Sequence, residues 1–160
     1  NMTKLKVLFI CTHNRCRSIL SEAITNKIAG GAIEARSAGS NPAAAVHPLS
    51  LKYLKQTGYQ THGLKSQSWN DFEEFTPNIV ITVCDSAAAE VCPVYFGSSL
   101  KVHWGLSDPS KIQGDAAELE QAFLSCIDKI AMRAEKLRNV ASQELDKPAL
   151  QAALIAIGEI

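Results

Sequence analysis

One short segment places a cysteine, an arginine and a serine at a spacing that suits attack on a tetrahedral oxyanion. Cys11 to Ser18 has the form C-x5-R-S and stands between an apolar run, residues 6–10, and a helical pattern. Backbone N–H groups of a loop at a helix N-terminus form a concave anion site, and the planar guanidinium of Arg17 can hold two oxygens. The same positive field favours a thiolate, so we expect Cys11 to be a nucleophile near neutral pH, with Ser18 donating a hydrogen bond to its sulfur.

The chain around this segment alternates expected strands with expected helices. That alternation predicts an α/β fold in which helices flank a four-stranded parallel sheet, and right-handed crossovers lead us to the strand order 2-1-3-4. A capped helical turn is expected at Ser68, and Asp115 with Glu118 forms a capping box for the longest helix. The expected strands are residues 6–10, 33–37, 78–84 and 100–104. The first expected helix follows Ser18 and ends at Gly30-Gly31, and the others cover residues 49–56, 115–137 and 146–157.

The predicted strand order brings three reactive side chains to one edge of the sheet. Cys11 follows the first strand, Cys84 ends the third and Asp108 follows the fourth. Ligands of open parallel sheets bind beyond the carboxyl ends of the strands, where the strand order reverses. Adjacent strands lie about 4.8 Å apart. We therefore expect the thiols of Cys11 and Cys84 to lie within reach of each other.

Composition limits the classes of partner. The chain has 160 residues, of which 46% are hydrophobic and 20% are charged, so we expect one globular domain over residues 1–160. Sixteen Lys and Arg balance sixteen Asp and Glu, which argues against binding to nucleic acid or to a membrane surface. No apolar stretch approaches the ~20 residues of a membrane span, so we expect a cytoplasmic protein with reduced thiols. Asn1 precedes Met2, the expected initiator, and we treat it as an addition.

These motifs resemble those of the low-molecular-weight tyrosine phosphatase superfamily, and more closely its arsenate reductase branch. The resemblance runs through residues 11–18, 37–39, 80–93 and 103–105 to Asp108-Pro109. It implies a phosphatase-like fold with Cys11 as nucleophile and Asp108 as the general acid that protonates the leaving oxygen. The implied oxyanion-binding loop consists of Thr12, His13, Asn14, Arg15, Cys16, Arg17 and Ser18.

A second thiol distinguishes reduction of arsenate from hydrolysis of a phosphate ester. A phosphatase needs only the nucleophile, the groups that bind the oxyanion and the general acid, whereas a reductase must also accept electrons from thiols. Cys84 can attack the Cys11 sulfur of an arsenic adduct, forming a disulfide as arsenite departs. Phosphatases of this superfamily carry tyrosines just after Asp-Pro, but this chain has Ser110-Lys111. The sequence therefore predicts an arsenate reductase, with a tyrosine phosphatase as the alternative.

Cys92 is the candidate for the thiol that resolves the first disulfide. The resemblance implies a Cys84–Cys92 disulfide that thioredoxin reduces, although seven residues separate these cysteines here and six in the thioredoxin-coupled members. A continuous helix would hold the two cysteines about 12 Å apart, which is beyond disulfide range, so the segment between them must unwind or loop back. Glutathione with glutaredoxin is the alternative reductant. We expect no organic cofactor and no metal.

Two interpretations without arsenate chemistry use the same cysteines. Cys11, Cys16, Cys84 and Cys92 could form a zinc-binding or thiol-sensing module, although the second pair is spaced more widely than is usual for zinc. A phosphoryl carrier is less consistent with the presence of both Arg17 and Asp108. Two of the thiols, Cys16 and Cys126, are also expected to pack inward as small buried side chains.

Overall fold

The computed structural model describes residues 3–160, which form a four-stranded parallel sheet with the order β2-β1-β3-β4. This order is the one predicted from the alternation of elements. Asn1 and Met2 lie outside the described residues. The strands are β1 (Leu5–Ile10), β2 (Ile33–Ala38), β3 (Ile79–Thr82) and β4 (Leu100–His103).

The central strand is β1 because its side chains can be buried on both faces. Residues 7–10 are at most 2% exposed, and parallel partners on both sides satisfy their backbone N–H and C=O groups. Ile10, the last residue of β1, pairs with Ala38 of β2 and with Thr82 of β3. Three strands therefore end at the same edge of the sheet, and the segments that follow them lie together.

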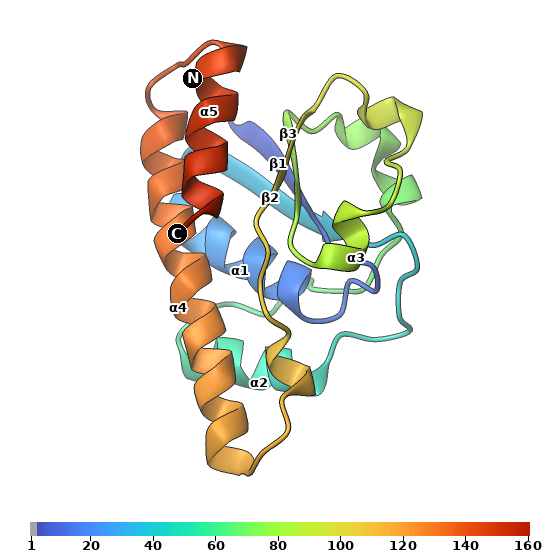
Figure 1. Ribbon diagram of the computed structural model, residues 1–160, viewed down its shortest axis with the longest axis vertical. Coiled ribbons are helices and arrows are strands. Elements are labelled where there is room, and N and C mark those ends of the chain that lie inside the picture. Colours follow the sequence, from blue (N-terminus) through green and yellow to red (C-terminus); the bar gives the residue numbers. More distant parts are fainter. Residues whose placement is uncertain (1–2) are drawn as a thin grey trace.

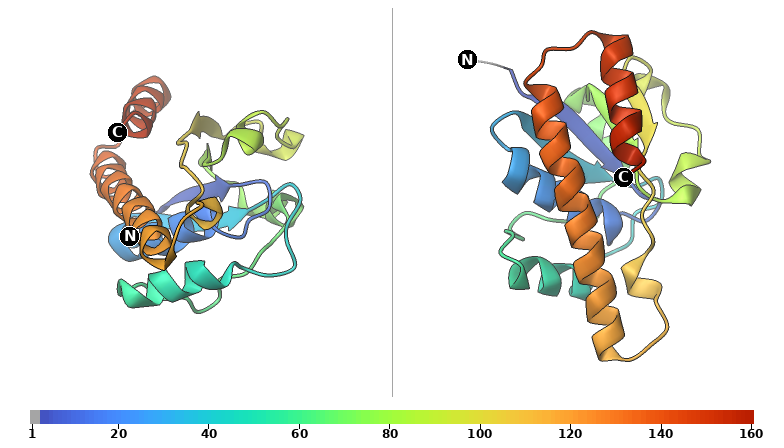
Figure 2. Two further views of the ribbon diagram at one scale, coloured as in Figure 1. Left: turned by 60° about the horizontal axis from the view of Figure 1, so that its bottom comes forward. Right: turned by 60° about the vertical axis from the view of Figure 1, so that its left-hand side comes forward.

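Helices cover the sheet as the sequence predicted. The first helix packs on β1 and β2, the longest packs on the first, and the last packs on β4. Figure 1 shows α4 and α5 along one flank of the molecule and α3 on the opposite flank, and the turned views of Figure 2 agree. The α-helices are α1 (Arg17–Ala29), α2 (Pro48–Gln56), α3 (Asp85–Ala88), α4 (Ala116–Ala141) and α5 (Lys147–Gly158), and the 3-10 helices are η1 (Trp69–Phe75), η2 (Val94–Phe96) and η3 (Pro109–Lys111).

Local signals in the sequence determine where the two C-terminal helices begin. The side chain of Asp115 accepts the N–H of Glu118, and the Glu118 side chain accepts the N–H of Asp115, which confirms the predicted capping box. Asp146 caps α5 in the same way by accepting the N–H of Ala149 at 2.9 Å. None of the helices within residues 3–160 is long and apolar enough to cross a membrane.

The third strand is shorter than predicted, and this changes the surroundings of Cys84. The expected strand covered residues 78–84, but β3 ends at Thr82 because its neighbour β1 ends at Ile10. Val83 still donates its N–H to the Ile10 carbonyl at 2.9 Å, and Cys84 then stands at the start of α3. Since α3 ends at Ala88, the segment between Cys84 and Cys92 is not one continuous helix, as the sequence required.

Gly39 allows the end of β2 to lie against the loop that carries Cys11. A Cβ at this position would lie 2.4 Å from the Thr12 carbonyl oxygen and 2.7 Å from that of Cys11, which are distances that force the backbone to move. We expect Gly39→Ala to lower the free energy of unfolding by about 1–3 kcal/mol and to weaken phosphate binding. Urea unfolding and calorimetric titration with phosphate measure the two effects.

Gly31→Ala is the matched control, because a Cβ there meets no atom within 4 Å. Unchanged stability and unchanged phosphate affinity in Gly39→Ala would contradict the importance of this close approach.

Candidate active site

A hollow of about 130 Å³ opens at the edge of the sheet where β1 and β3 end. A hollow of this size has room for a small tetrahedral oxyanion. The hollow brings together four of the five predicted catalytic residues and six of the seven predicted loop residues, and it leaves out Cys92 and Ser18. It is lined by Cys11, Thr12, His13, Asn14, Arg15, Cys16, Arg17, Cys84, Ser86, Asp108 and Lys111.

The backbone of the loop turns its carbonyl groups away from this hollow. The carbonyl oxygens of Thr12, His13 and Arg15 accept hydrogen bonds of 2.9–3.0 Å from N–H groups of the segment 41–47. Because the C=O and N–H of one peptide point in opposite directions, the amides of His13 and Cys16 face the hollow. Such amides form a concave anion site, to which the N-terminus of α1 adds partial positive charge.

Asn14 fixes the shape of the loop from inside. Its φ of +46° lies in the left-handed region, which asparagine tolerates better than most residues. The buried side-chain amide donates to the Ser18 hydroxyl at 2.8 Å and accepts the N–H of Gln67 at 2.8 Å. Ser18 is thus bonded to Asn14, and a bond from Ser18 to the Cys11 sulfur, which the sequence led us to expect, is not found among residues 3–160.

Arg17 joins the loop to the segment that carries Asp108. Its Nη1 donates to the Leu106 carbonyl at 2.9 Å, and its Nη2 lies 3.5 Å from Asp108 Oδ2. The buried Nε has no hydrogen-bond partner within residues 3–160. A donor in this state is suited to an oxyanion oxygen, because an unpaired buried N–H is costly until an acceptor binds.

Asp108 is ionised in this arrangement. Burial alone would raise the pKa of Asp108, but two hydrogen bonds from Ser110, at 2.6 and 2.9 Å, favour the carboxylate. Attraction to Arg17 and Lys111 adds to these bonds, and the pKa of Asp108 falls below its usual value. The carboxyl must therefore gain a proton before it can act as an acid.

The thiols of Cys11 and Cys84 line the same hollow, and each shifts the pKa of the other. Interaction with Cys11 lowers the pKa of Cys84 to about 4, helped by hydrogen bonds of 3.4 Å to the N–H of Thr12 and to the Ser86 hydroxyl. Interaction with Cys84, together with burial, raises the pKa of Cys11, although the charge of Arg17 opposes both. The directions of these shifts favour a thiolate at Cys84, around which more donors lie than around Cys11. The ionised Cys11 that the sequence led us to expect stays a prediction.

The other three cysteines lie apart from this pair. Cys92 is half-buried and lines a separate hollow beside β3 and β4, and burial raises the pKa of its thiol. Burial also raises the pKa of Cys16 to about 11 and that of Cys126 to about 12, and both are buried as predicted. All five thiols are free. Within residues 3–160 we find no cluster of three or more His, Cys, Asp or Glu that could hold a metal ion.

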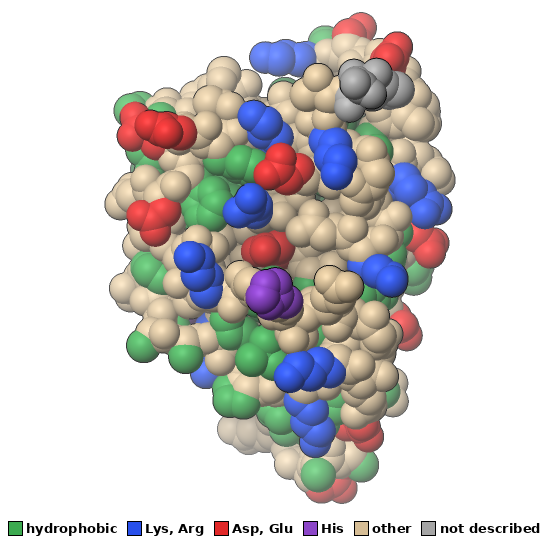
Figure 3. Space-filling view, turned by 180° about the vertical axis from the view of Figure 1, so that it is seen from behind, with side chains coloured by type: hydrophobic (Ala, Val, Ile, Leu, Met, Phe, Trp, Pro, Cys, Tyr) green, Lys and Arg blue, Asp and Glu red, His purple; other side chains and the backbone are tan. Residues whose placement is uncertain are grey.

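Sequence reasoning missed two polar side chains that line the hollow. Ser86 stands two residues after Cys84, and Lys111 stands on η3, three residues after Asp108. Following the chain beyond the end of the third strand could have identified Ser86, but nothing in the sequence marks Lys111. On the face shown in Figure 3, basic and acidic side chains are interspersed. The arginine and lysine side chains that line the hollow are Arg15, Arg17 and Lys111.

A buried cysteine between a central strand and a helix, with an arginine and an aspartate around one hollow, defines the class of cysteine-dependent phosphatase folds. Comparison with known families agrees. The chain belongs to the low molecular weight phosphotyrosine protein phosphatase family, whose model matches residues 6–150.

Individual relatives cover most of the chain. It is 33% identical, over 82% of its length and 94% of the relative's, to a protein of Halalkalibacterium halodurans named arsenate reductase. A thioredoxin-dependent arsenate reductase of Corynebacterium glutamicum has 28% identity and a TM-score of 0.68 over 89% of this chain, which spans only 64% of that longer one. A low molecular weight phosphotyrosine phosphatase of Vibrio cholerae, 19% identical, shares the fold with a TM-score of 0.69 over 88% of this chain and 99% of its own.

Titration of the reduced protein tests the lowered pKa of Cys84. We expect one thiolate to form with a pKa of about 4, present above that pH and lost below it, because Cys84 accepts several hydrogen bonds. Ultraviolet absorbance of the thiolate, followed against pH, measures it. In Cys84→Ser this titration should disappear, while Cys92→Ser should leave it unchanged. A low-pH titration that survives in Cys84→Ser would show that the charge lies elsewhere.

Proposed function

We propose that this protein reduces arsenate to arsenite by a thiol relay that begins with Cys11 and Cys84. The observation that carries the proposal is the placement of these two buried sulfurs in one small hollow that Arg17 also lines. A phosphatase needs one of the thiols, whereas a reductase needs both. The names of relatives at 28–33% identity support the same activity.

In the first step, arsenate binds over the loop amides and Arg17, and the Cys11 sulfur attacks arsenic. The proton of Cys11 moves to Cys84, so that Cys11 attacks as a thiolate. A sulfur–arsenic bond forms and an arsenic–oxygen bond breaks. Asp108, protonated once the anion has bound, gives its proton to the departing oxygen, which leaves as water.

In the second step, electrons pass from sulfur to arsenic. Asp108, now a carboxylate, takes the proton from Cys84, whose thiolate attacks the Cys11 sulfur. A disulfide between Cys11 and Cys84 forms while the sulfur–arsenic bond breaks. Its electron pair stays on arsenic, which is thereby reduced from the pentavalent to the trivalent state and leaves as arsenite.

The third step returns the nucleophile to its reduced form. We propose that Cys92 attacks the Cys84 sulfur and releases Cys11 as a thiolate. An external dithiol of the thioredoxin type then reduces the resulting Cys84–Cys92 disulfide. The thioredoxin dependence of the relative from Corynebacterium glutamicum supports this reductant over glutathione with glutaredoxin. Because free thiols in this state require a reducing compartment, the proposal includes a cytoplasmic location.

Tyrosine phosphatase activity is the second candidate, and the same hollow favours it as a weak activity on phosphate esters. The loop of Cys11, with Arg17 and Asp108, contains the groups that such a reaction needs. Ser110 and Lys111 follow Asp108-Pro109 where an aromatic slot would need tyrosines. We therefore propose arsenate as the main substrate.

Substitution of single sulfurs tests the relay directly. We expect Cys11→Ser to lose both arsenate reduction and phosphate-ester hydrolysis, by about 10³-fold or more. Cys84→Ser should lose arsenate reduction to the same extent yet keep phosphate binding and ester hydrolysis, because only the electron-transfer step needs its sulfur. Arsenite release and ester hydrolysis are measured separately on each variant.

Cys92→Ser is the matched comparison for the relay. It should still form the Cys11–Cys84 disulfide in a single turnover with arsenate but should fail to turn over with thioredoxin. Normal arsenate reduction by Cys84→Ser would refute the proposed function.

Asp108→Asn tests the role of Asp108 as the general acid. The amide keeps an oxygen for the Ser110 bonds but cannot give a proton to the leaving oxygen, so we expect disulfide formation to slow by about 10²–10⁴-fold. Phosphate affinity should stay the same or rise, because a negative charge beside the anion is removed. Rapid-quench analysis and calorimetry measure these quantities. Disulfide formation at the wild-type rate would exclude Asp108 as the acid.

A further inference from the structure

A hydrogen-bonded chain that the proposed steps do not use connects the Cys11 loop to the segment after Cys84. Thr12 Oγ1 lies 2.8 Å from Ser86 Oγ and donates to Glu90 Oε1 at 3.1 Å. The N–H of Thr12 also points at the Cys84 sulfur, at 3.4 Å. Thr12 is therefore in contact with three residues of the segment 84–90, and Glu90 is the most distant of them along the chain.

Counting protons limits the roles of donor and acceptor in this chain. A carboxylate only accepts, so the single hydroxyl proton of Thr12 goes to Glu90. The single hydroxyl proton of Ser86 can then go to Thr12 Oγ1 at 2.8 Å or to the Cys84 sulfur at 3.4 Å, but not to both at once. The acceptor oxygen of Glu90 thus orients the Thr12 hydroxyl beside Ser86 and that sulfur.

The turn between Cys84 and Glu90 is held by few bonds of its own. The N–H groups of Ala88, Ala89 and Glu90 each donate at 3.2 Å to a carbonyl three or four residues earlier. A helix as short as α3 is not stable by itself in water. The next residue, Val91, is 91% exposed. A side-chain bond to the rest of the protein therefore matters for the conformation of this turn.

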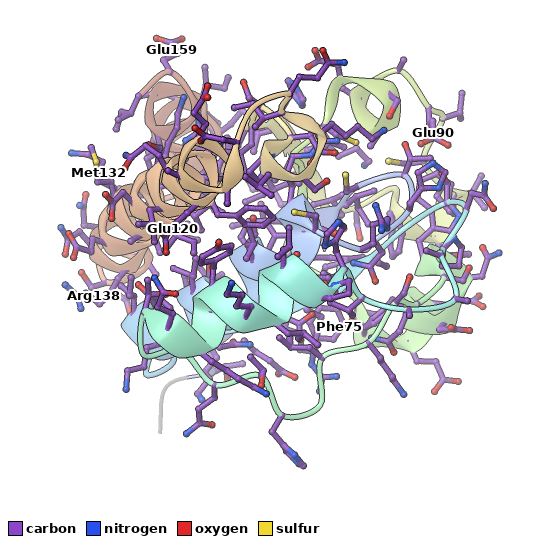
Figure 4. The ribbon with its side chains drawn as sticks, turned by 90° about the horizontal axis from the view of Figure 1, so that it is seen from below. Phe75, Glu90, Glu120, Met132, Arg138 and Glu159 are labelled. Atoms are coloured by element: carbon purple, nitrogen blue, oxygen red, sulfur yellow. The ribbon has the colours of Figure 1, made fainter. Side chains whose placement is uncertain are left out.

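Glu90 stands between two cysteines that occupy different places. Cys84 lines the oxyanion hollow, whereas Cys92 lines the hollow beside β4, to which Glu90 also contributes. The side chain of Glu90 lies at the outer edge of the molecule in Figure 4. A disulfide brings two Cα atoms within about 7 Å. For Cys84 to pair with Cys92, the turn must open, and the bond from Thr12 to Glu90 is one that ties the turn to the loop.

We propose that Glu90 is a positioning residue of the relay: by accepting the Thr12 hydroxyl, it keeps the turn 85–90 closed so that Cys84 faces Cys11. The order of the two disulfides rests on the proposed function, but the closed turn does not. Once Cys84 is bonded to Cys11, its sulfur is no longer an anion and the donors around it bind more weakly. The bond to Glu90 then limits how fast the turn opens toward Cys92.

Three variants separate the hydrogen bond from the charge. Glu90→Ala removes both, Glu90→Gln keeps an acceptor oxygen without the charge, and Glu74→Ala removes an exposed carboxylate elsewhere as a control. Amide hydrogen exchange of residues 88–90 in the reduced protein reports the closed turn without arsenate. A single turnover with one equivalent of arsenate, quenched with an alkylating agent, gives the ratio of the Cys84–Cys92 to the Cys11–Cys84 disulfide by mass spectrometry.

In Glu90→Ala we expect exchange at these amides to rise on the order of tenfold and the disulfide ratio to shift toward Cys84–Cys92 by a similar factor. Glu90→Gln and Glu74→Ala should stay close to the wild type. The positioning role would be overturned if amide exchange and the disulfide ratio were unchanged in Glu90→Ala. It would also be overturned if Glu90→Gln behaved like Glu90→Ala. A third outcome is faster amide exchange in Glu90→Ala while the protein forms no disulfide with arsenate. That outcome would support the closed turn and overturn the proposed function.

Discussion

The coupling between two buried thiols is the interaction on which the site depends. Cys11 and Cys84 come from segments far apart in sequence, and each has a thiol whose pKa is shifted mainly by the other. A pair of this kind titrates as a unit, because ionising one sulfur makes ionising the second more difficult. Transfer of a proton from one thiol to the other therefore decides which sulfur attacks.

The sheet makes this pairing possible and keeps water from the sulfurs. β1 and β3 are adjacent and parallel, so the residues that follow them must meet at one edge. The exposed fraction is 7% for Cys11 and 2% for Cys84. Burial raises the pKa of an isolated thiol, as it does for Cys126. At Cys84 the interactions with Cys11, Ser86 and the Thr12 N–H outweigh burial, and the pKa of its thiol falls.

The sequence was informative wherever a rule links residue type to backbone geometry. Alternating apolar patterns and right-handed crossovers gave the strand order, and Asp115 with Glu118 gave the start of α4. The placement of Cys11 and Cys84 around one hollow followed from the strand order. These features depend on periodicity and chain direction, which a single sequence contains.

Features that depend on contacts between residues far apart in the chain could not be predicted from the sequence. Which of the two sulfurs is ionised depends on the donors that surround each one. The hydroxyl of Ser86 lies near Cys84 because β3 ends early. Arg133 is 3% exposed on a helix predicted to present an apolar stripe. Its partners are carbonyl groups at the ends of other segments, and no spacing in the sequence indicates them.

Two arginines hold the backbone that leads to the acid. Arg133 donates to the carbonyls of Trp104 and Gly105 at 3.1 and 3.3 Å, and Arg17 donates to that of Leu106 at 2.9 Å. Arg133 also donates to the backbone oxygens of Gly158 and Ile160. Arg17 also lies 3.5 Å from Asp108, and an oxyanion competes for its charge. Binding of the anion therefore weakens the attraction that lowers the pKa of Asp108 and adds a like charge that raises it. A carboxylate that is ionised before binding thus gains its proton when the substrate that needs an acid has arrived.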